Sequence, residues 1–578
     1  MLPAHYAGGL SSLGPLILSA LLAVPAAAQG SDWVPFDRSQ FSGNATLDTE
    51  GHVQLFWEIG DEYSTYGIAS QSSGYLALGF SETGAMTGAD MAVGYMDDGE
   101  FVLENRWASG FVTPQLSEDQ EYNVRLQGGG QEDGVTWFIF EKKNTADCLE
   151  NQVTVATRAW QWFIYAFSDD NTFGQHEDEN KGKRYIKLGS EETIFVNEIV
   201  EVQNTMNWTI VQPEITIPTD ETTYCYTLHR VPEGDRHFMI AERPRISSDL
   251  LHHLVIYACY SPSDDLLEML GQEPNCDYEN FSNPCNGFVT EWAPGMSGRT
   301  FEDGYGKPFG SDFYEYVMFE THYSNPAGLE GLNDTASYTL LYTDEEVDNV
   351  IGSLTLGDLQ VNGWFLEPGQ ELVAHSTVCT PECTGDWPEE GITAFSVFHH
   401  MHARGRHARV QIIRDGEEIA PLSTLRDFEY DFQFSKGLEQ IQLFPGDRFI
   451  TTCWYDTSDD TEPVPGGVAS KDEMCFAWVD YYPLSTILAC TQYDTGNETL
   501  GLCLDTSEAE PTLYETDMLT ASYENFTHPG DVCLAPNGTT QNGSAQSGND
   551  GGDDDDSAAS TISFGSAVLI TLLSLFVI

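Results

Sequence analysis

Short runs of alternating apolar and polar residues fill the first third of the chain, as in residues 53–57 and 135–140. Gly, Asp and Ser residues separate these runs. A strand with one buried face alternates in this way, and many short strands at close spacing are typical of an antiparallel β-sandwich. The pattern predicts one β-sandwich over residues 33–190.

The region from residue 219 to residue 502 also lacks long helical periodicity. Residues 314–319 are rich in aromatic and β-branched side chains, which indicates a largely buried strand. A length of about 280 residues is enough for two domains of ordinary size. We therefore predict an all-β chain, in which the first sandwich is followed by two stacked antiparallel, jelly-roll-like sandwiches at residues 219–350 and 355–502.

The chain is strongly acidic, with a formal net charge of −67 from 91 acidic and 24 basic residues. Nucleic acid and anionic membrane surfaces are poor partners for such a chain on electrostatic grounds. A cationic substrate or a metal ion would be attracted. A solvated, self-repelling surface is the simpler explanation of the charge, so the charge alone identifies no function.

The two ends of the sequence predict a route to the cell exterior. Residues 10–24 are mostly apolar or small and lead into Ala26, Ala27 and Ala28, which is typical of a signal peptide over residues 1–28. Residues 503–560 are polar and predict a stalk. Residues 561–578 end in an apolar run from Ala567 to Ile578, which is too short for a comfortable transmembrane helix and is typical of a glycolipid-anchor signal.

Cysteines and glycosylation sequons agree with this route. The 12 cysteines form an even number, which suits an oxidising compartment. N-x-Ser/Thr sequons are acceptors only in the secretory pathway, and they occur at Asn44, Asn207, Asn280, Asn333, Asn497, Asn525, Asn537 and Asn542. We expect a glycoprotein on the extracellular face of the plasma membrane, held by the lipid anchor, or a secreted protein.

Two clusters among the 14 histidines are candidates for metal binding. Residues two apart in a strand share a face, so His400 and His402 can bind one ion. The adjacent His252 and His253 would point apart, and can share an ion only if the backbone bends. Imidazole is a good ligand for copper and zinc, and the thioether of a methionine favours Cu(I).

Five ordered motifs carry a family resemblance. They are residues 236–240, His252-His253, residues 320–326, His400-Met401-His402 and residues 473–475. In this order they resemble the motifs of copper type II, ascorbate-dependent monooxygenases of the dopamine β-hydroxylase-like family, over roughly residues 219–495. Residues 76–94 resemble a DOMON domain, a sandwich found at the front of such hydroxylases.

The resemblance implies two copper ions per subunit. His252, His253 and His322 would hold one ion, and His400, His402 and Met474 the other, where O2 would bind. Ascorbate would supply electrons, and the activated C–H bond of a small substrate would gain a hydroxyl group. The three-histidine site would then pass its electron across a solvent-filled cleft between the two sandwiches.

The resemblance also implies six disulfides, and the sequence departs from the family pattern at two positions. The pairs are Cys225–Cys276, Cys259–Cys285, Cys379–Cys490, Cys453–Cys475, Cys383–Cys503 and Cys148–Cys533. Trp478 stands where the family usually has tyrosine. Phe398 stands where peptide-amidating relatives have a carboxylate-binding arginine, which disfavours a peptide substrate and leaves amines and phenols open. Tyr481 is compatible with a cationic substrate.

A second class of function stays open. Some DOMON domains bind haem through a methionine and a histidine, and Met86 and His176 occupy suggestive places. The chain would then be a cell-surface haem- or carbohydrate-binding module with an inactive monooxygenase-like core. All six copper ligands are present, which favours the enzyme. The sequence names neither the substrate nor the oligomeric state.

Overall fold

The computed structural model describes residues 33–515, apart from residues 49, 118–122, 146–151, 158–159, 190–194, 197–201, 203, 261, 278–283, 286, 294–295, 359–362, 468, 470, 495–498 and 507–511. The predicted signal peptide, the tail and most of the stalk lie outside these residues, and so does the Cys148–Cys533 pair. Within the described part of the chain, no helix combines the length and the apolar character needed to cross a membrane.

Residues 33–189 form the front sandwich, in which two sheets enclose one apolar core. Its side chains include Leu55, Ile68, Leu78, Phe140 and Phe163, all fully or almost fully buried. One sheet orders β1 (Gly43–Thr46), β2 (Val53–Glu58), β3 (Tyr63–Ser70), β9 (Val135–Lys143) and β8 (Val124–Glu132); the other orders β11 (Lys181–Lys187), β10 (Trp160–Phe167), β4 (Leu76–Ser81), β5 (Asp90–Asp97), β6 (Glu100–Trp107) and β7 (Gln115–Leu116). The short 3₁₀ turns η1 (Arg38–Gln40) and η2 (Asp178–Asn180) lie outside the sheets.

The middle sandwich follows, with a core between a seven-stranded and a four-stranded sheet. The larger sheet contains β12 (Phe195–Val196), β13 (Met206–Val211), β16 (His237–Arg245), β19 (Arg299–Phe301), β20 (Tyr305–Phe309), β23 (Ser337–Thr343) and β24 (Asn349–Val350). The smaller sheet orders β15 (Thr222–Arg230), β21 (Tyr316–Ser324), β17 (Leu251–Cys259) and β18 (Gly287–Trp292). The pair β14 (Ile215–Thr216) and β22 (Asn333–Asp334) and helix α2 (Asp264–Leu267) complete it.

The rear sandwich has the same two-sheet plan. Its larger sheet orders β31 (Lys436–Leu443), β28 (Ile392–His400), β34 (Phe476–Tyr482), β25 (Gly352–Gly357), β35 (Ile487–Asp494), β36 (Thr499–Asp505) and β37 (Thr512–Glu515). Its smaller sheet orders β27 (Val373–Cys379), β32 (Arg448–Tyr455), β29 (Gly405–Arg414) and β30 (Glu417–Leu425). The pair β26 (Phe365–Leu366) and β33 (Val464–Pro465) and helix α3 (Pro381–Thr384) lie outside these sheets.

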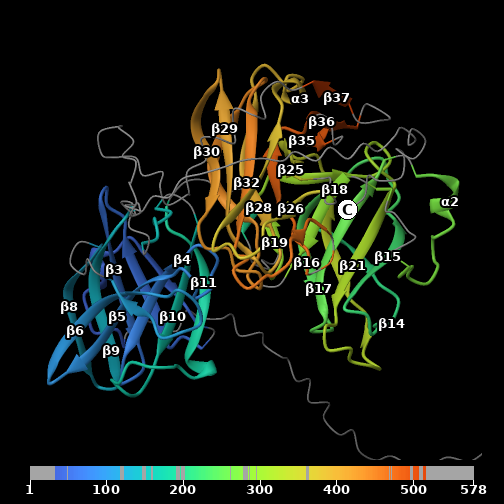
Figure 1. Cartoon of the computed structure of the whole chain (residues 1–578). Helices are drawn as coiled ribbons and strands as arrows, with labels where there is room; N and C mark the ends of the chain where they lie inside the picture. Colours follow the sequence, from blue (N-terminus) through green and yellow to red (C-terminus); the bar gives the residue numbers. More distant parts are fainter. Residues whose placement is uncertain are drawn as a thin grey trace, which may run out of the picture.

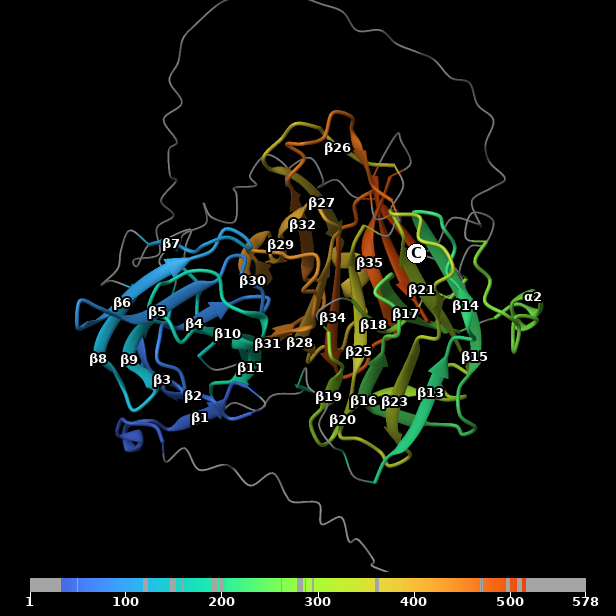
Figure 2. The same cartoon turned by 90° about the horizontal axis from the view of Figure 1, so that it is seen from below.

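The prediction of a chain of three β-sandwiches is therefore confirmed. The described strand pairs are antiparallel except for β20 with β24 and β25 with β35, which are parallel. Figures 1 and 2 show the middle and rear sandwiches packed together, while the front sandwich lies beside the rear one, next to β30 and β31. The front sandwich thus reaches the other two mainly through the rear sandwich.

Five disulfides stabilise the middle and rear sandwiches. They join Cys225 to Cys276, Cys259 to Cys285, Cys379 to Cys490, Cys383 to Cys503 and Cys453 to Cys475. Each of these pairs confirms a predicted one. Loop closure by a disulfide lowers the entropy of the unfolded chain, so these bonds stabilise the two sandwiches that carry the histidine motifs.

Candidate metal centre

A β-bulge brings His252 and His253 to the same side of β17. Leu251 lies opposite Tyr323 of β21, and His253 lies opposite His322, so His252 is an extra residue in the ladder. A bulge bends its strand and redirects the side chains next to it. The bend that two adjacent histidines need in order to share an ion is therefore present, and His322 joins them from the neighbouring strand.

The three imidazoles converge through the same ring atom. The Nδ1 of His252 lies 3.1 Å from the Nδ1 of His253 and 3.1 Å from that of His322, and the third separation is 3.2 Å. The centre of this triangle lies about 1.8 Å from each nitrogen, which is close to the usual nitrogen–metal distance of about 2.0 Å. The group can hold one metal ion.

Hydrogen bonding among the three rings cannot explain this triangle. A ring nitrogen of a neutral imidazole either carries a proton or offers a lone pair, so it cannot donate and accept in a closed ring of three. Burial lowers the pKa of His252 to about 3, and it lowers the pKa of His253 and His322 well below the ordinary value, with the neighbouring histidines adding to the effect. Neutral imidazoles with converging lone pairs are metal ligands.

His400 and His402 present their other ring nitrogen. The Nδ1 of His400 donates to the Oε1 of Gln433 at 2.8 Å, and the Nδ1 of His402 donates to the carbonyl oxygen of Asp472 at 3.0 Å. These bonds fix the tautomer that leaves the lone pair on Nε2. The Nε2 of His402 is buried and has no hydrogen-bond partner among the described residues. Both rings are therefore prepared to bind a metal through Nε2.

His402 lies two residues beyond the end of β28, so it does not share a strand face with His400 as expected. The turn still places the two rings with their centroids 5.3 Å apart. His399 points the other way, toward the Ser423 hydroxyl at 3.0 Å, as strand alternation requires. Met474 is buried and follows Glu473, whose carboxylate accepts the backbone N–H of His402.

The two histidine groups form one cluster, which corrects the expectation of a solvent-filled cleft. The ring centroid of His253 lies 5.6 Å from that of His400, and the centroid of His252 lies 6.1 Å from that of His402. All five side chains are at most 7% exposed. We call His252, His253, His322, His400 and His402 the five-histidine cluster. It forms because the outer face of sheet β15–β21–β17–β18 packs against the outer face of the sheet that contains β28 and β34.

Buried charges also hold the middle and rear sandwiches together. Arg299 of the middle sandwich donates to Glu242 at 2.8 Å and to Asp480 of the rear sandwich at 2.6 Å. Lys307 also pairs with Asp480, at 2.9 Å. Asp480 is buried, and the cations Lys307 and Arg299 hold its pKa below the ordinary value against the opposing effect of burial. Separating one partner of a buried ion pair from the other is costly. These ion pairs, which we call the Arg299–Asp480 clasp, therefore favour the packing of the middle sandwich against the rear one.

An aromatic wall flanks His400. Phe288 of the middle sandwich and Trp478 of the rear sandwich stack with their ring centroids 4.8 Å apart. The ring centroid of Phe398 lies 5.5 Å from that of Trp478. The Trp478 ring lies 5.9 Å from that of His400. The substituted position of the family pattern is therefore part of the site. Tyr481 is not, because its hydroxyl lies in the core of the rear sandwich and donates to the carbonyl oxygen of Ser485.

Sequence reasoning missed the segment that touches both histidine groups. Residues 426–435, which we call the bridging segment, join β30 to β31. Its Tyr430 stacks on His252 at 4.7 Å, and its Gln433 bonds to His400. Tyr224 stacks on His322 at 4.2 Å in a similar way. Tyrosine and glutamine carry no metal-site signal in a sequence, so only the fold could identify them.

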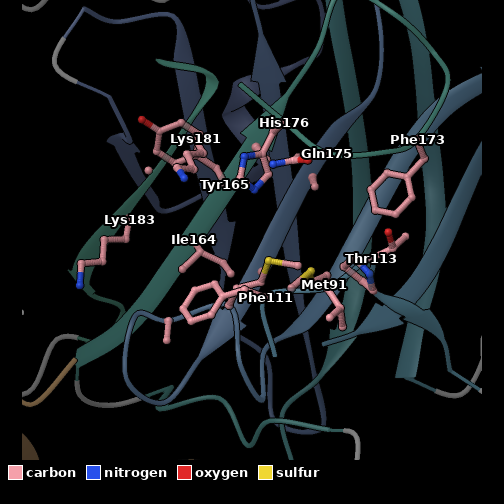
Figure 3. Close-up of a pocket in the computed structure, with 18 of the residues that line it drawn as sticks. Met91, Phe111, Thr113, Ile164, Tyr165, Phe173, Gln175, His176, Lys181 and Lys183 are labelled. Atoms are coloured by element: carbon pink, nitrogen blue, oxygen red, sulfur yellow. The ribbon is translucent and has the colours of Figure 1, made fainter. Parts of the chain in front are cut away.

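The front sandwich contains a cavity of about 760 Å³, which we call the front cavity. Met86 and His176 both line it, as the haem hypothesis requires. The Nδ1 of His176 is buried and has no hydrogen-bond partner among the described residues. Figure 3 shows His176 above the sheet face that carries Met91 and Ile164. The structure thus brings the two candidate haem ligands to one space.

Comparisons with known proteins agree with this site. Residues 208–330 match the family described as copper type II ascorbate-dependent monooxygenase, N-terminal domain, residues 350–500 match its C-terminal domain, and residues 49–168 match the DOMON domain. DBH-like monooxygenase protein 1 from Homo sapiens is 28% identical over 465 residues, which cover 77% of this chain and 73% of that protein. Dopamine beta-hydroxylase from Homo sapiens is 26% identical over 487 residues, which cover 81% and 77%.

A solved structure of the cytochrome b domain of pyranose dehydrogenase from Coprinopsis cinerea is also similar. It is 14% identical and covers 26% of this chain and 82% of that one. Its TM-score is 0.22, so this likeness carries no argument about fold or ligand.

Proposed function

Because the chain belongs to the copper type II, ascorbate-dependent monooxygenases and carries a DOMON domain in front of them, we propose that it hydroxylates an activated C–H bond of a small amine or phenol. The reaction would consume O2 and take its electrons from ascorbate. One observation carries the proposal: five buried imidazoles from two sandwiches converge in one cluster.

Two copper ions per subunit fit the donor set. His252, His253 and His322 would hold one ion through Nδ1, and His400, His402 and Met474 the other through two Nε2 atoms and a thioether. Copper, when bound, supplies single electrons and activates O2, and a thioether ligand favours its reduced form. The histidine rings of both groups are prepared for this role because they are held neutral.

Other residues fix the tautomers of His400 and His402 and the turn that carries them. Gln433 and the Asp472 carbonyl each hold an Nδ1 proton, so the Nε2 lone pairs stay available. The carboxylate of Glu473 accepts the backbone N–H groups of His402 and Arg404, at 2.9 and 2.8 Å, which fixes the turn. The aromatic wall and the packed sandwiches exclude water from the cluster, which protects reactive intermediates.

The aromatic wall supports an aromatic or other apolar substrate. Phe398, Trp478 and Phe288 offer ring faces next to His400, and ring stacking recognises a flat apolar group. Phe398 cannot grip a carboxylate, which would need a bidentate cation. A small aromatic amine or phenol therefore suits the site better than a peptide end.

We further propose that the protein acts outside the cell. The five disulfides among the described residues suit an oxidising compartment. Anchoring through a glycolipid would be revealed by release of the protein from cell membranes with a phosphatidylinositol-specific phospholipase. Retention on the membrane after that treatment would contradict the anchor.

Copper analysis together with oxygen uptake tests the proposed function. The purified ectodomain is expected to bind two coppers and to consume O2 with ascorbate in the presence of phenethylamines or phenols. His322→Ala and Met474→Ala are each expected to lose one of the two ions and the oxygen uptake. His229→Ala and Met206→Ala, outside the cluster, serve as matched controls and should keep both. A wild-type protein without copper would overturn the proposal.

A second candidate function is haem binding in the front cavity. It is favoured by the placement of Met86 and His176 around one apolar space and by the unpartnered Nδ1 of His176. The absorption spectrum tests it, because haem gives a strong Soret band that type II copper lacks. The band should disappear in His176→Ala and in Met86→Ala, and a purified protein without the band after incubation with hemin would exclude this function.

A further inference from the structure

The front cavity has the size and lining of a small-molecule site. Its volume of about 760 Å³ lies in the usual range for drug-sized ligands. It opens on the outer face of strands β4, β5 and β10, where Met91 and Ile164 form its floor (Figure 3). Phe111, Tyr165 and Phe173 contribute rings to its walls. The lining therefore favours a flat, largely apolar ligand.

A lysine makes the front cavity favourable for a ligand that carries an anionic group. Lys183 lines it, and its Nζ lies 5.0 Å from the Trp162 ring centroid and 4.3 Å from that of Phe432. Within the described part of the chain no carboxylate pairs with Lys183. A half-buried ammonium that lies over two aromatic rings would be stabilised by an anionic group of a ligand.

One wall residue comes from a different sandwich. Phe432 belongs to the bridging segment of the rear sandwich, yet it lines the front cavity. The centroid of its ring lies 6.2 Å from that of the Phe111 ring. The next residue, Gln433, bonds to His400 in the five-histidine cluster. Neighbouring side chains of one segment thus contact two separate sites.

The bridging segment is held firmly enough to transmit a displacement. The backbone N–H of Arg426 donates to Glu82 at 2.9 Å, and the Thr87 hydroxyl donates to Glu429 at 3.1 Å. The rings of Phe434 and Trp162 form a T-shaped pair with their centroids 5.5 Å apart. Gln433 donates its amide to the Tyr430 carbonyl at 3.0 Å, which ties the two cluster contacts together.

We propose that the front cavity binds a flat aromatic molecule with an anionic group, and that the bound ligand acts on His400 through Phe432 and Gln433. The ligand presses on the Phe432 ring, which sets the position of Gln433 and thereby the orientation of the His400 imidazole. The front domain is then an effector domain for the metal site. This inference rests on the proposed function, since its readout is copper binding.

Thermodynamic linkage makes the coupling measurable with one probe. If a ligand in the front cavity changes the copper affinity, copper must change the affinity for that ligand by the same factor. The probe is 8-anilinonaphthalene-1-sulfonate, a flat aromatic sulfonate that fluoresces when bound. Its dissociation constant is measured on the full ectodomain, first free of copper and then loaded with two coppers.

The wild type is expected to bind the probe saturably, and the dissociation constant is expected to differ by about 5-fold or more between the two copper states. Lys183→Ala should weaken binding in both states, whereas Lys187→Ala, on the same strand but outside the cavity lining, should not. Gln433→Leu should abolish the difference at a copper concentration at which metal analysis finds both coppers bound. Gln440→Leu, on the exposed part of β31, should retain it.

Two results overturn the inference. Probe binding that Lys183→Ala leaves unchanged would show that the front cavity is not the site. Equal dissociation constants with and without copper in the wild type would show that no coupling exists. Failure of the proposed function is seen separately, because metal analysis of the same sample reports whether two coppers are bound at all.

Discussion

The extra residue in β17 turns His252 and His253 toward the same side, although alternation in a regular strand would separate them. The sequence indicated that a bend was needed, but a bulge depends on the register with β21 and cannot be read from β17 alone. His322 was placed by family resemblance, and the register puts it opposite His253. Gln433 and Tyr430 could not be predicted, because their roles arise from packing between segments distant in sequence.

Gln433→Leu is expected to weaken copper binding at the second histidine group. The variant removes the acceptor of the His400 Nδ1 proton, so the ring can rotate and change tautomer. Loss of such a partner typically lowers metal affinity by about 10- to 100-fold. Competition with a copper chelator measures the effect. Gln440→Leu should match the wild type, and equal affinities for all three proteins would contradict the role given to Gln433.

At the scale of elements, the bridging segment joins the front sandwich to the other two. Gly88, with a φ of +71°, faces the Asp427 side chain so closely that a Cβ there would lie 2.2 Å from it. Only glycine satisfies both the backbone angle and the close approach at this position. The alternating patterns predicted strands and sandwiches, because burial of one face is a local property. They could not predict a contact made by an irregular loop.

Asp427 is expected to make stability pH-dependent. Burial raises its pKa to about 7, and the nearby Glu82 adds to this effect. Between about pH 4 and pH 7 the unfolded chain releases a proton that the folded protein retains, so this contribution to stability falls as the pH rises. Asp427→Asn removes this contribution. The melting temperature of the variant minus that of the wild type should therefore increase by a few degrees from pH 4 to pH 7.

Thermal unfolding of both proteins at pH 4, 5.5 and 7 measures this difference. Other carboxyl groups titrate equally in the two proteins, so the comparison isolates Asp427. Asp431→Asn is at an exposed position of the same segment, and its melting temperature should change with pH in the same way as that of the wild type. Parallel curves for Asp427→Asn as well would show that the carboxyl group is not held protonated.

At the scale of the whole molecule, the closed packing of the middle and rear sandwiches decides the geometry of the site. The number and order of the sandwiches followed from pattern and length. Their relative placement did not, because it depends on Arg299 and Asp480, which lie 181 residues apart. Charged residues in a sequence are usually exposed, so nothing in the pattern marks these two as buried partners.

Asp480→Asn is expected to destabilise the protein strongly. It leaves the buried cations Arg299 and Lys307 without their shared carboxylate, and loss of one partner of a buried pair typically costs about 3 to 5 kcal/mol. Differential scanning calorimetry should show a melting temperature lower by roughly 10 °C for the transition of the paired sandwiches. Asp459→Asn, at an exposed position, is the control. A change of less than about 1 °C in Asp480→Asn would show that the clasp contributes little.

Burial of the five-histidine cluster also has a kinetic consequence. The imidazoles of the cluster are at most 7% exposed and leave little surface for an arriving molecule. Under the proposed function, entry of reactant and exit of product would therefore require the sandwiches to part and close again. Turnover would then be limited by a gating motion, and the Arg299–Asp480 clasp would set its frequency. A more viscous solvent would slow such an enzyme even at saturating reactant.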